Sequence, residues 1–281
     1  SVASGDITNF FNEVDLNTPW DYHYENLDSR TILDRLAAVK YFVVKAGEEE
    51  YLPYGYDTLA AEVEKNDKLY RAYECKNALP IGYTYDSYIP EEKYAKMSTV
   101  EKQQALLQGV ILSNSTVPET TSEFNDREVP YKLVTGSGCR EKDGKLIVTK
   151  ENAQAKLVFD GLDECETYLI TEGVDYEALS PRELISDKKW SKMTLYEQKK
   201  IQYENSTWRY WKESQKAYID VTGQFLDKTI SIFTDKYNAY SGRSDFLCNT
   251  GYSVKRKKSI TLTFENTGVY SYKNMKVVCQ P

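Results

Sequence analysis

The alternation of apolar and polar residues divides the chain into two parts with different periods. From Val129 onward, apolar residues recur at every second position in short runs separated by turn residues, which is typical of half-buried strands. The turn Asp143-Gly144 between two such runs predicts a tight β-hairpin. The runs are residues 130–135, 145–149, 155–159, 167–171, 215–221, 228–233, 259–264 and 275–279. Short strands at this spacing predict a jelly-roll-like β-sandwich over residues 129–281.

Before residue 129 the pattern changes between helix and strand. An apolar helix face follows Asp28, and the runs 39–45 and 68–74 are rich in Val, Phe and Tyr, which favour strands. Between these strands, the apolar spacing over residues 58–65 predicts a second helix. We therefore expect a small mixed α/β sheet domain over residues 1–128, and an α+β fold for the chain as a whole.

A turn follows the second of these strands. Asn77 can hydrogen-bond its own backbone there, and Pro80 fixes its own φ and biases Leu79 toward extended geometry. Residues 81–85 are expected to continue as a third extended run. We interpret this corner as the sheet nucleus of the first domain and not as an active site. Its motif residues, together with those of the strand before it, are Val39, Lys40, Tyr41, Asn77, Leu79, Pro80 and Gly82.

Two further segments complete the predicted organisation. Residues 90–112 are helical in pattern, with a capping box of Ser98 and Glu101, and the polar linker over residues 113–128 predicts a domain boundary. Residues 177–212 then interrupt the strands with helical signals. We expect this helical insertion to lie over the sandwich and to bury one of its faces.

Aromatic side chains concentrate in the helical insertion, which holds three of the four tryptophans. Rings of this kind either pack against a neighbouring sheet or stack on sugar rings at a binding surface. Both interpretations stay open at this point. The candidates for contact with a glycan or a partner are Trp190, Tyr203, Trp208, Tyr210, Trp211, Trp20 and Tyr22.

Charge narrows the class of partner. The 281 residues have a formal net charge of −7, which argues against nucleic acid as a partner. The one basic cluster, Lys255-Arg256-Lys257-Lys258, is expected to be a solvated turn or a strand edge protected by charge. Its alternative interpretation is contact with an anionic polymer or with lipid headgroups. No run of about 18 apolar residues is present, so we do not expect the chain to span a membrane.

Recognisable catalytic chemistry is absent from the sequence. His23 is the single histidine, which excludes zinc sites built on several histidines. The glycine-rich turn at residues 135–138 has neither the context of a nucleophile elbow nor the lysine of a phosphate-binding loop. The five cysteines are widely spaced and are expected to be buried as small apolar residues. If bridges form, the candidate pairs are Cys139–Cys165 and Cys248–Cys279. We therefore predict no catalytic residue, no metal site and no cofactor.

Several short motifs resemble one family. They are LAAVKYFVV (36–44), YLPYGY (51–56), YECKNALPIGYTY (73–85), ETYLITEG (166–173), DFLCNTGYS (245–253) and SITLTFENTGVYSY (259–272). Together they resemble the extracytoplasmic C-terminal part of YfhO-type bacterial membrane proteins. The resemblance extends over most of the chain and is weakest in the helical insertion.

The resemblance implies a location and a role. The family is similar to multi-span glycosyltransferases that use lipid-linked sugars and are implicated in glycosylating lipoteichoic acid in Gram-positive envelopes. Their catalytic carboxylates lie in loops near membrane spans, which this chain lacks. The chain is then expected to be a monomeric domain on the extracytoplasmic face of the cell membrane, next to its own transmembrane region.

Three functions are compatible with these expectations. The first is a non-catalytic domain that binds envelope glycan or a teichoic-acid acceptor. The second is a purely structural domain that packs on its own membrane region. The third is a glycoside hydrolase, which requires two carboxylates about 5–9.5 Å apart across a cleft.

Overall fold

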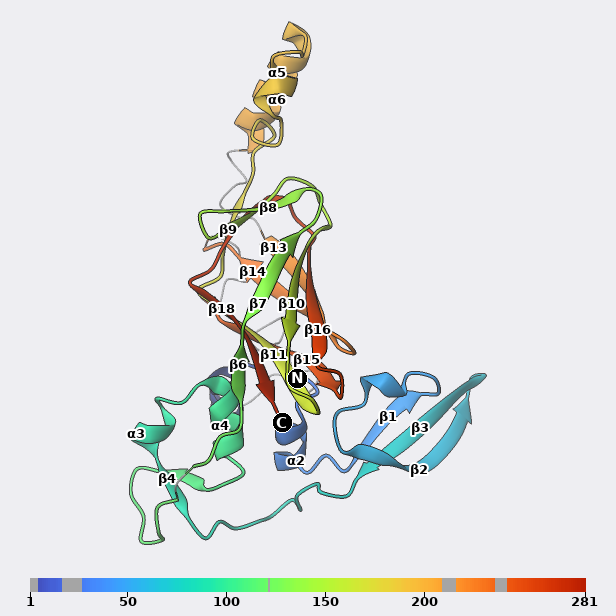
Figure 1. Ribbon diagram of the computed structural model, residues 1–281, viewed down its shortest axis with the longest axis vertical. Coiled ribbons are helices and arrows are strands. Elements are labelled where there is room, and N and C mark those ends of the chain that lie inside the picture. Colours follow the sequence, from blue (N-terminus) through green and yellow to red (C-terminus); the bar gives the residue numbers. More distant parts are fainter. Residues whose placement is uncertain (1–4, 17–26, 121, 209–215, 236–241) are drawn as a thin grey trace.

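The computed structural model describes residues 5–16, 27–120, 122–208, 216–235 and 242–281, and three antiparallel sheets form its body (Figure 1). The first sheet has the strand order β14 (Asp227–Phe233), β13 (Lys216–Thr222), β16 (Lys257–Phe264), β10 (Ala153–Asp160) and β7 (Tyr131–Thr135). The second has the order β15 (Phe246–Ser253), β11 (Cys165–Glu172), β18 (Asn274–Gln280) and β6 (Arg127–Val129). The third has the order β12 (Asp175–Ala178), β17 (Gly268–Ser271), β9 (Lys145–Val148) and β8 (Cys139–Lys142). The last three strands of the chain, β16, β17 and β18, therefore enter three different sheets.

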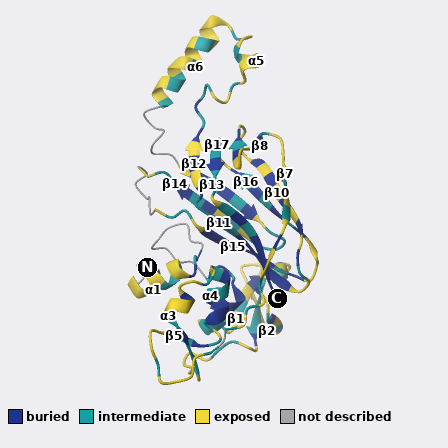
Figure 2. Cartoon of the chain, turned by 60° about the vertical axis from the view of Figure 1, so that its left-hand side comes forward, coloured by how far each residue is buried: buried dark blue, intermediate teal, exposed yellow. Residues whose placement is uncertain are grey.

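The main core lies between these sheets. Along β10 every second residue is buried, beginning with Ala153 and ending with Phe159, which is the period that the sequence predicts. These side chains join one apolar cluster with residues of the other sheets, such as Leu169 and Tyr270. The buried positions follow the strands of the body, while the loops and the helical insertion are exposed (Figure 2).

The predicted strands of the second part are all present, with small shifts at their ends. The chain is thus an α+β protein made of several antiparallel sheets, and the jelly-roll connectivity stays a prediction. The hairpin turn is confirmed, because Asp143 and Gly144 have φ values of 52° and 71° and connect β8 to β9. In the second part the pattern missed β8, β12, β15 and β17, and it also missed β6 at the start of this part.

The helix predicted over residues 58–65 is wrong. These residues form β2 (Tyr56–Lys65), which pairs with β3 (Lys68–Cys75) in a hairpin. Asn66 and Asp67 form its turn with φ values of 52° and 56°, as in the tight turns that connect twisted strands. The apolar residues of this segment fit a period of two as well as a helical period, so their spacing alone does not distinguish a strand from a helix. The tight turn at Asn66 and Asp67 favours the strand, because it folds the segment back against β3.

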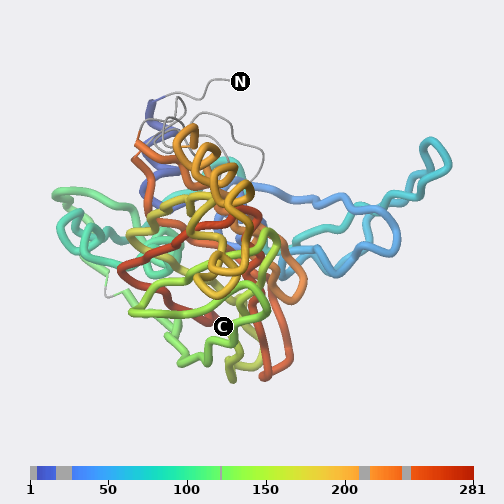
Figure 3. The backbone as a smooth tube through the Cα atoms, turned by 90° about the horizontal axis from the view of Figure 1, so that it is seen from above, coloured from blue at the N-terminus to red at the C-terminus, as the bar shows by residue number. Residues whose placement is uncertain are grey.

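The β2–β3 hairpin and β1 (Tyr41–Lys45) form a separate three-stranded sheet that extends away from the body (Figures 1 and 3). The strand predictions for residues 39–45 and 68–74 are confirmed. Residues 81–85 form no strand, in contrast to the predicted third extended run, and Ile81 is 98% exposed. The first part therefore contains an antiparallel sheet and, separately, the short parallel pair of β4 (Tyr88–Pro90) and β5 (Val110–Leu112).

Short helices connect the first part to the body. The helix predicted after Asp28 is α2 (Thr31–Leu36), and the capping box of Ser98 and Glu101 begins α4 (Thr99–Ala105). Of the predicted helical segment 90–112, the helices are α3 (Glu91–Tyr94) and α4, and its end is β5. Val100 of α4 packs against Tyr168, Leu247 and Val278 of the second sheet. The boundary at residue 128 stays a prediction. The remaining helices of the first part are α1 (Gly5–Glu13) and the 3-10 helix η1 (Glu49–Tyr51).

The helical insertion does not lie over the sandwich, so this expectation is wrong. It consists of α5 (Asp187–Trp190) and α6 (Leu195–Trp208), which stand beyond the end of the sheets (Figures 1 and 2). None of the described residues of α6 is buried. A capping box of Thr194 and Glu197 begins α6. Ser180 and Glu183 make the same kind of contacts, but only a turn follows them.

Candidate anion-binding site

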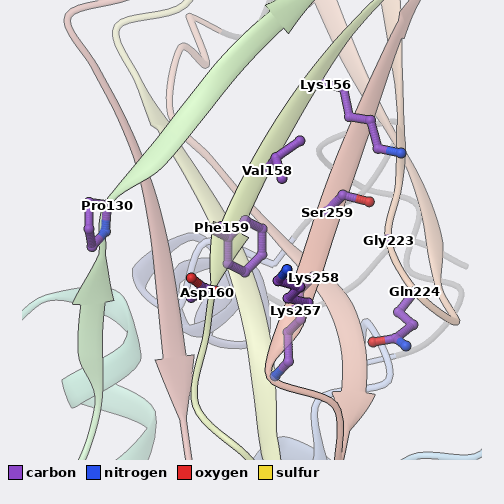
Figure 4. A pocket seen from close by; sticks show the side chains of 10 residues that line it. All are labelled: Pro130, Lys156, Val158, Phe159, Asp160, Gly223, Gln224, Lys257, Lys258 and Ser259. Atoms are coloured by element: carbon purple, nitrogen blue, oxygen red, sulfur yellow. The ribbon is translucent and has the colours of Figure 1, made fainter.

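A cavity of about 630 Å³ lies where β10 ends and β16 begins. Its lining residues come from the junction between β6 and β7, from β10 and β16, and from the turn between β13 and β14 (Figure 4). They are Pro130, Lys156, Val158, Phe159, Asp160, Gly223, Gln224, Lys257, Lys258 and Ser259. The lining thus contains three lysines and one aspartate, so its formal charge is positive although the whole chain is acidic.

The register of the first sheet brings these residues together. Val158 of β10 lies opposite Ser259 of β16, and Asp160 lies opposite Lys257. Because alternate residues point to the same face of a strand, the polar and charged residues of both strands share the outer face of the sheet, except Lys258, which is in phase with the buried residues of β16. Lys132 of β7 lies opposite Val158 and extends the positive charge to the next strand.

The cavity also offers a hydrogen-bond acceptor. The side-chain oxygen Oε1 of Gln224 is buried and has no hydrogen-bond partner among the described residues. A buried acceptor without a partner is costly, and the hydroxyl group of a ligand would satisfy it once the side chain of Gln224 turns toward the cavity. Lysines, an unsatisfied amide oxygen and the hydroxyl of Ser259 form a set of groups suited to a ligand that has both phosphates and hydroxyls.

The basic cluster at residues 255–258 supplies two of the lysines. Lys255 and Arg256 lie in a turn, as one of the two structural interpretations expects. The interpretation as a strand edge is wrong, because β16 is an internal strand between β13 and β10. Lys257 and Lys258 were not among the site residues predicted from the sequence. The signal that could have found them is the position of Lys258, which is in phase with the buried residues of β16.

Lys258 is the buried member of this cluster, with 7% of its surface exposed. Its Nζ donates hydrogen bonds to Cys165 Sγ at 2.8 Å and to Thr167 Oγ1 at 3.3 Å. Lys258 therefore lines the cavity and also contacts the second sheet. Among the described residues, none of the ion pairs of the protein gives Lys258 a carboxylate partner.

The aromatic candidates of the sequence analysis lie elsewhere. Trp190 stacks on Arg182, whose guanidinium carbon is 4.4 Å from the ring centroid, and Tyr203 is 74% exposed on α6. Trp208 is half-buried and packs against the main core. None of these three residues lines the cavity. The other candidates, Trp20, Tyr22, Tyr210 and Trp211, lie outside the described residues, and binding by the aromatic set stays a prediction.

The motif residues of the predicted corner have structural contacts. The hydroxyl of Tyr56 donates to the carbonyl oxygen of Val39 at 2.7 Å, and Lys40 pairs with Glu74 at 3.1 Å. The backbone N–H of Leu79 donates to the carbonyl oxygen of Arg35 at 3.3 Å, which attaches the turn to the end of α2. These contacts agree with a structural interpretation of the corner.

A second group of charges is buried between α2 and the second sheet. Burial, and after it the charge of Glu166, raises the pKa of Asp34 to about 7. Glu166 accepts hydrogen bonds from Thr31 Oγ1 and from Tyr168 OH, both at 2.7 Å. Burial raises the pKa of Glu166 against these hydrogen bonds, which lower it. Because both oxygens of Glu166 accept hydrogen bonds inside the protein, we interpret the group as structural.

This cavity does not contain the pair of carboxylates that hydrolysis of glycosides requires. That reaction requires a general acid and a second carboxylate on either side of the substrate. The cavity contains a single carboxylate, that of Asp160. Over the part of the chain that the structure describes, no cluster of three or more His, Cys, Asp or Glu side chains suits a metal ion.

The sequence profile of the family described as "Bacterial membrane protein YfhO" matches residues 1–279. The chain belongs to this family. A curated relative, the uncharacterized protein YfhO of Bacillus subtilis (strain 168), is 24% identical over 155 residues. The match covers 54% of the chain and 17% of that protein, so the aligned part is a minor portion of the relative.

Structural similarity adds no further argument. The chain has a TM-score of 0.25 and 9% identity to the uncharacterized protein lmo2446 of Listeria monocytogenes EGD-e, solved in complex with glucose, magnesium and calcium. That match covers 86% of the chain and 17% of lmo2446. Although the YfhO family is named for membrane proteins, no helix within the described ranges has the length and apolar character of a membrane span.

Proposed function

We propose that this YfhO-family chain is a non-catalytic, extracytoplasmic domain of a membrane glycosyltransferase. In this proposal a jelly-roll-like sandwich holds a teichoic-acid acceptor, or a related anionic envelope polymer, in the basic cavity. The observation that supports it most is the group of three lysines in the cavity wall of an otherwise acidic chain. Lysine is a common ligand of phosphate, and a polymer of repeated phosphates accumulates such contacts.

The cavity also suits the hydroxyl groups of such a polymer. Polyol phosphates alternate phosphates with hydroxyl-bearing carbons, and Gln224 Oε1 is an acceptor without a partner among the described residues. Inorganic phosphate, or a headgroup without hydroxyl-bearing carbons, would engage the lysines but would not require the acceptor. We therefore favour a polyol phosphate over a simple anion.

Charge reversal in the cavity is expected to weaken this binding. In the 281-residue chain, the double variant Lys156→Glu/Lys257→Glu should bind short glycerol-phosphate oligomers at least about tenfold more weakly than the wild type, a loss of about 1.4 kcal/mol. The reason is that both lysines would be replaced by groups that repel phosphate. Isothermal titration calorimetry at several salt concentrations measures the affinity, which should fall with salt for the wild type.

The matched control is Lys188→Glu/Lys189→Glu on α5, which changes the net charge by the same amount far along the chain from the cavity strands. Its affinity should equal that of the wild type. Equal losses in the two double variants would reduce the interaction to a general effect of charge. No binding by the wild type at millimolar ligand would refute the proposal.

A second function is favoured by a different observation. One face of the three-stranded sheet presents Tyr41, Val43 and Val63, which are 49%, 59% and 61% exposed. The register places their strands next to each other through β3, where Ala72 lies opposite Val43 and Tyr70 lies opposite Val63. An exposed apolar face of this kind is suited to packing on another part of the same protein, such as its membrane region.

This structural role predicts protection in the intact protein. In hydroxyl-radical footprinting, Tyr41 should react several times more slowly in the full-length membrane protein than in the 281-residue chain, because contact excludes solvent. Tyr196 of α6, which is 78% exposed, provides the internal reference. Equal reactivity of Tyr41 in the two proteins would contradict packing at this face.

A further inference from the structure

Two of the five cysteines share one hydrogen-bond network between neighbouring strands. Cys165 is the first residue of β11, and Cys279 lies near the end of β18. Thr167 of β11 lies directly opposite Cys279 of β18. Cys165, two residues before Thr167, is therefore the diagonal neighbour of Cys279 on the same face of the sheet. The hydroxyl oxygen of Thr167 is 3.8 Å from Cys165 Sγ and 3.9 Å from Cys279 Sγ. Both thiol groups are fully buried.

Lys258 gives this pair an unusual charge environment. Its Nζ is 2.8 Å from Cys165 Sγ, and both side chains are buried. A buried ammonium group requires a counter-charge, and a thiolate at Cys165 supplies it. The neighbouring thiol of Cys279, followed by the contact with Lys258, lowers the pKa of Cys165 against burial, which raises it. The pKa of Cys279 moves upward, because of the neighbouring Cys165 and because of burial.

The environments of two other cysteines provide a contrast. Burial alone raises the pKa of Cys139 to about 11, and burial is also the main cause that raises the pKa of Cys248 to about 12. Because the thiolate is the reactive form of cysteine, these two thiols should be inert. The candidate bridges of the sequence analysis, Cys139–Cys165 and Cys248–Cys279, do not form in the structure, which describes all five cysteines and contains no disulfide.

We propose that Cys165 and Cys279 are a redox-active dithiol, in which Lys258 holds Cys165 as the attacking thiolate and a low-molecular-weight disulfide is the oxidant. The Cys165 thiolate attacks one sulfur of the oxidant, forms a mixed disulfide and releases one thiolate. Cys279 then loses its proton and attacks Cys165 Sγ, which closes the internal disulfide and releases the second thiol. The protein loses two electrons and two protons in total, and the oxidant is reduced to two thiols.

The position of the pair makes the disulfide reversible. Diagonal neighbours in an antiparallel ladder have Cα atoms about 7–8 Å apart, whereas a disulfide spans about 4.4–6.8 Å. Closure therefore draws the ends of β11 and β18 together, and strained disulfides are the readily reduced ones. Cys165 Sγ lies behind the side chain of Lys258, which lines the cavity, so the oxidant reaches the thiolate from the cavity only when this side chain moves aside.

The test uses the 281-residue chain with oxidised glutathione at neutral pH, followed by intact mass and peptide mapping. The expected product lacks two hydrogens and contains one linked peptide pair, Cys165 with Cys279, while Cys139 and Cys248 are still alkylated after denaturation. In Cys279→Ser, the first step should be trapped as a single glutathionyl group on Cys165. A product without this link, or a link through another cysteine, would overturn the proposal.

The role of Lys258 is tested by rate. Lys258→Met should slow the first step at least tenfold, whereas Lys276→Met on β18, at the exposed face, should leave the rate unchanged. If the mixed disulfide formed at the same rate in Lys258→Met and in the wild type, Lys258 would have no role in activating Cys165. If Lys258→Met does not fold, the wild-type peptide map and the Cys279→Ser trap still decide whether the pair exists. These readouts do not involve the anionic polymer, so they are independent of the proposed function.

Discussion

Replacing Arg30 by methionine is expected to lower the free energy of unfolding by about 3–5 kcal/mol. Arg30 is fully buried before α2. Its guanidinium donates to the carbonyl oxygen of Val14 at 2.5 Å and to that of Asp15 at 2.7 Å, and its Nε is 3.4 Å from Asp28 Oδ2. Methionine would fill much of the same volume but would leave these buried acceptors without their donor.

The charge of Asp28 makes this loss large. Asp28 is also buried, and Lys228 of β14 pairs with its Oδ1 at 2.7 Å, so Arg30, Asp28 and Lys228 form one ion-pair network. Removing one member of a buried ion-pair network leaves the charges of the other members incompletely balanced. The resulting loss of stability is larger than the net contribution of the intact ion pair. The network connects the segment before α2 to the first sheet, and its disruption should loosen that contact.

Urea unfolding followed by circular dichroism measures the difference. The matched control is Arg71→Met, because Arg71 also makes two carboxylate contacts, with Glu49 at 2.7 Å and Glu62 at 3.2 Å, but at the surface. Its loss is expected to cost less than about 1 kcal/mol. Similar costs for the two variants would show that burial of the network does not determine its contribution.

The second large effect concerns Asp34 and pH. Because the pKa of Asp34 is raised to about 7 in the folded protein, the folded state binds more protons than the unfolded state between about pH 4 and pH 7. Stability should therefore fall as the pH rises through this window, by up to roughly 4 kcal/mol, and should level off above it. The cause is burial first, then repulsion from Glu166 and Asp28, against attraction to Lys228.

Asp34→Asn should remove most of this dependence, because the amide has the shape of the carboxyl group and no charge to bury. Unfolding in urea at pH 5 and pH 8 compares the slopes of the variant and the wild type. Asp143→Asn is the control, since it removes an aspartate from the β8–β9 turn, where asparagine is equally suited. If Asp34→Asn kept the full slope of the wild type, the titrating group would have to be another carboxyl.

How much of the fold follows from sequence depends on whether one face of a strand is exposed. Buried and exposed residues alternate along β10, and the corresponding alternation of apolar and polar residues in the sequence predicted this strand. β15 is buried at nearly every position, because Cys248 packs in the main core on one face while Leu247 packs with Val100 of α4 on the other. Without an exposed face the sequence has no alternation to detect, so this strand was missed.

The candidate site was harder to predict for a related reason. A run of four basic residues is usually a solvated turn, and Lys255 and Arg256 follow that rule. Only the pairing of β16 with β10 brings Lys257 next to Asp160, and this pairing joins residues about a hundred positions apart. The contact of Lys258 with Cys165 depends in addition on the packing of two sheets. Local sequence patterns contain neither kind of information.

The arrangement of the last three strands has a consequence for biosynthesis. β16, β17 and β18 each complete a different sheet, and all three lie inside their sheets. A ribosome delivers the chain from its N-terminal end, so β10 and β11 emerge long before the partners that pair with their exposed edges. Until residues 257–280 follow, the nascent body has unpaired edges in all three sheets, which are templates for association with other chains. We expect the body to fold late and in one step, and to need protection while it waits for its final strands.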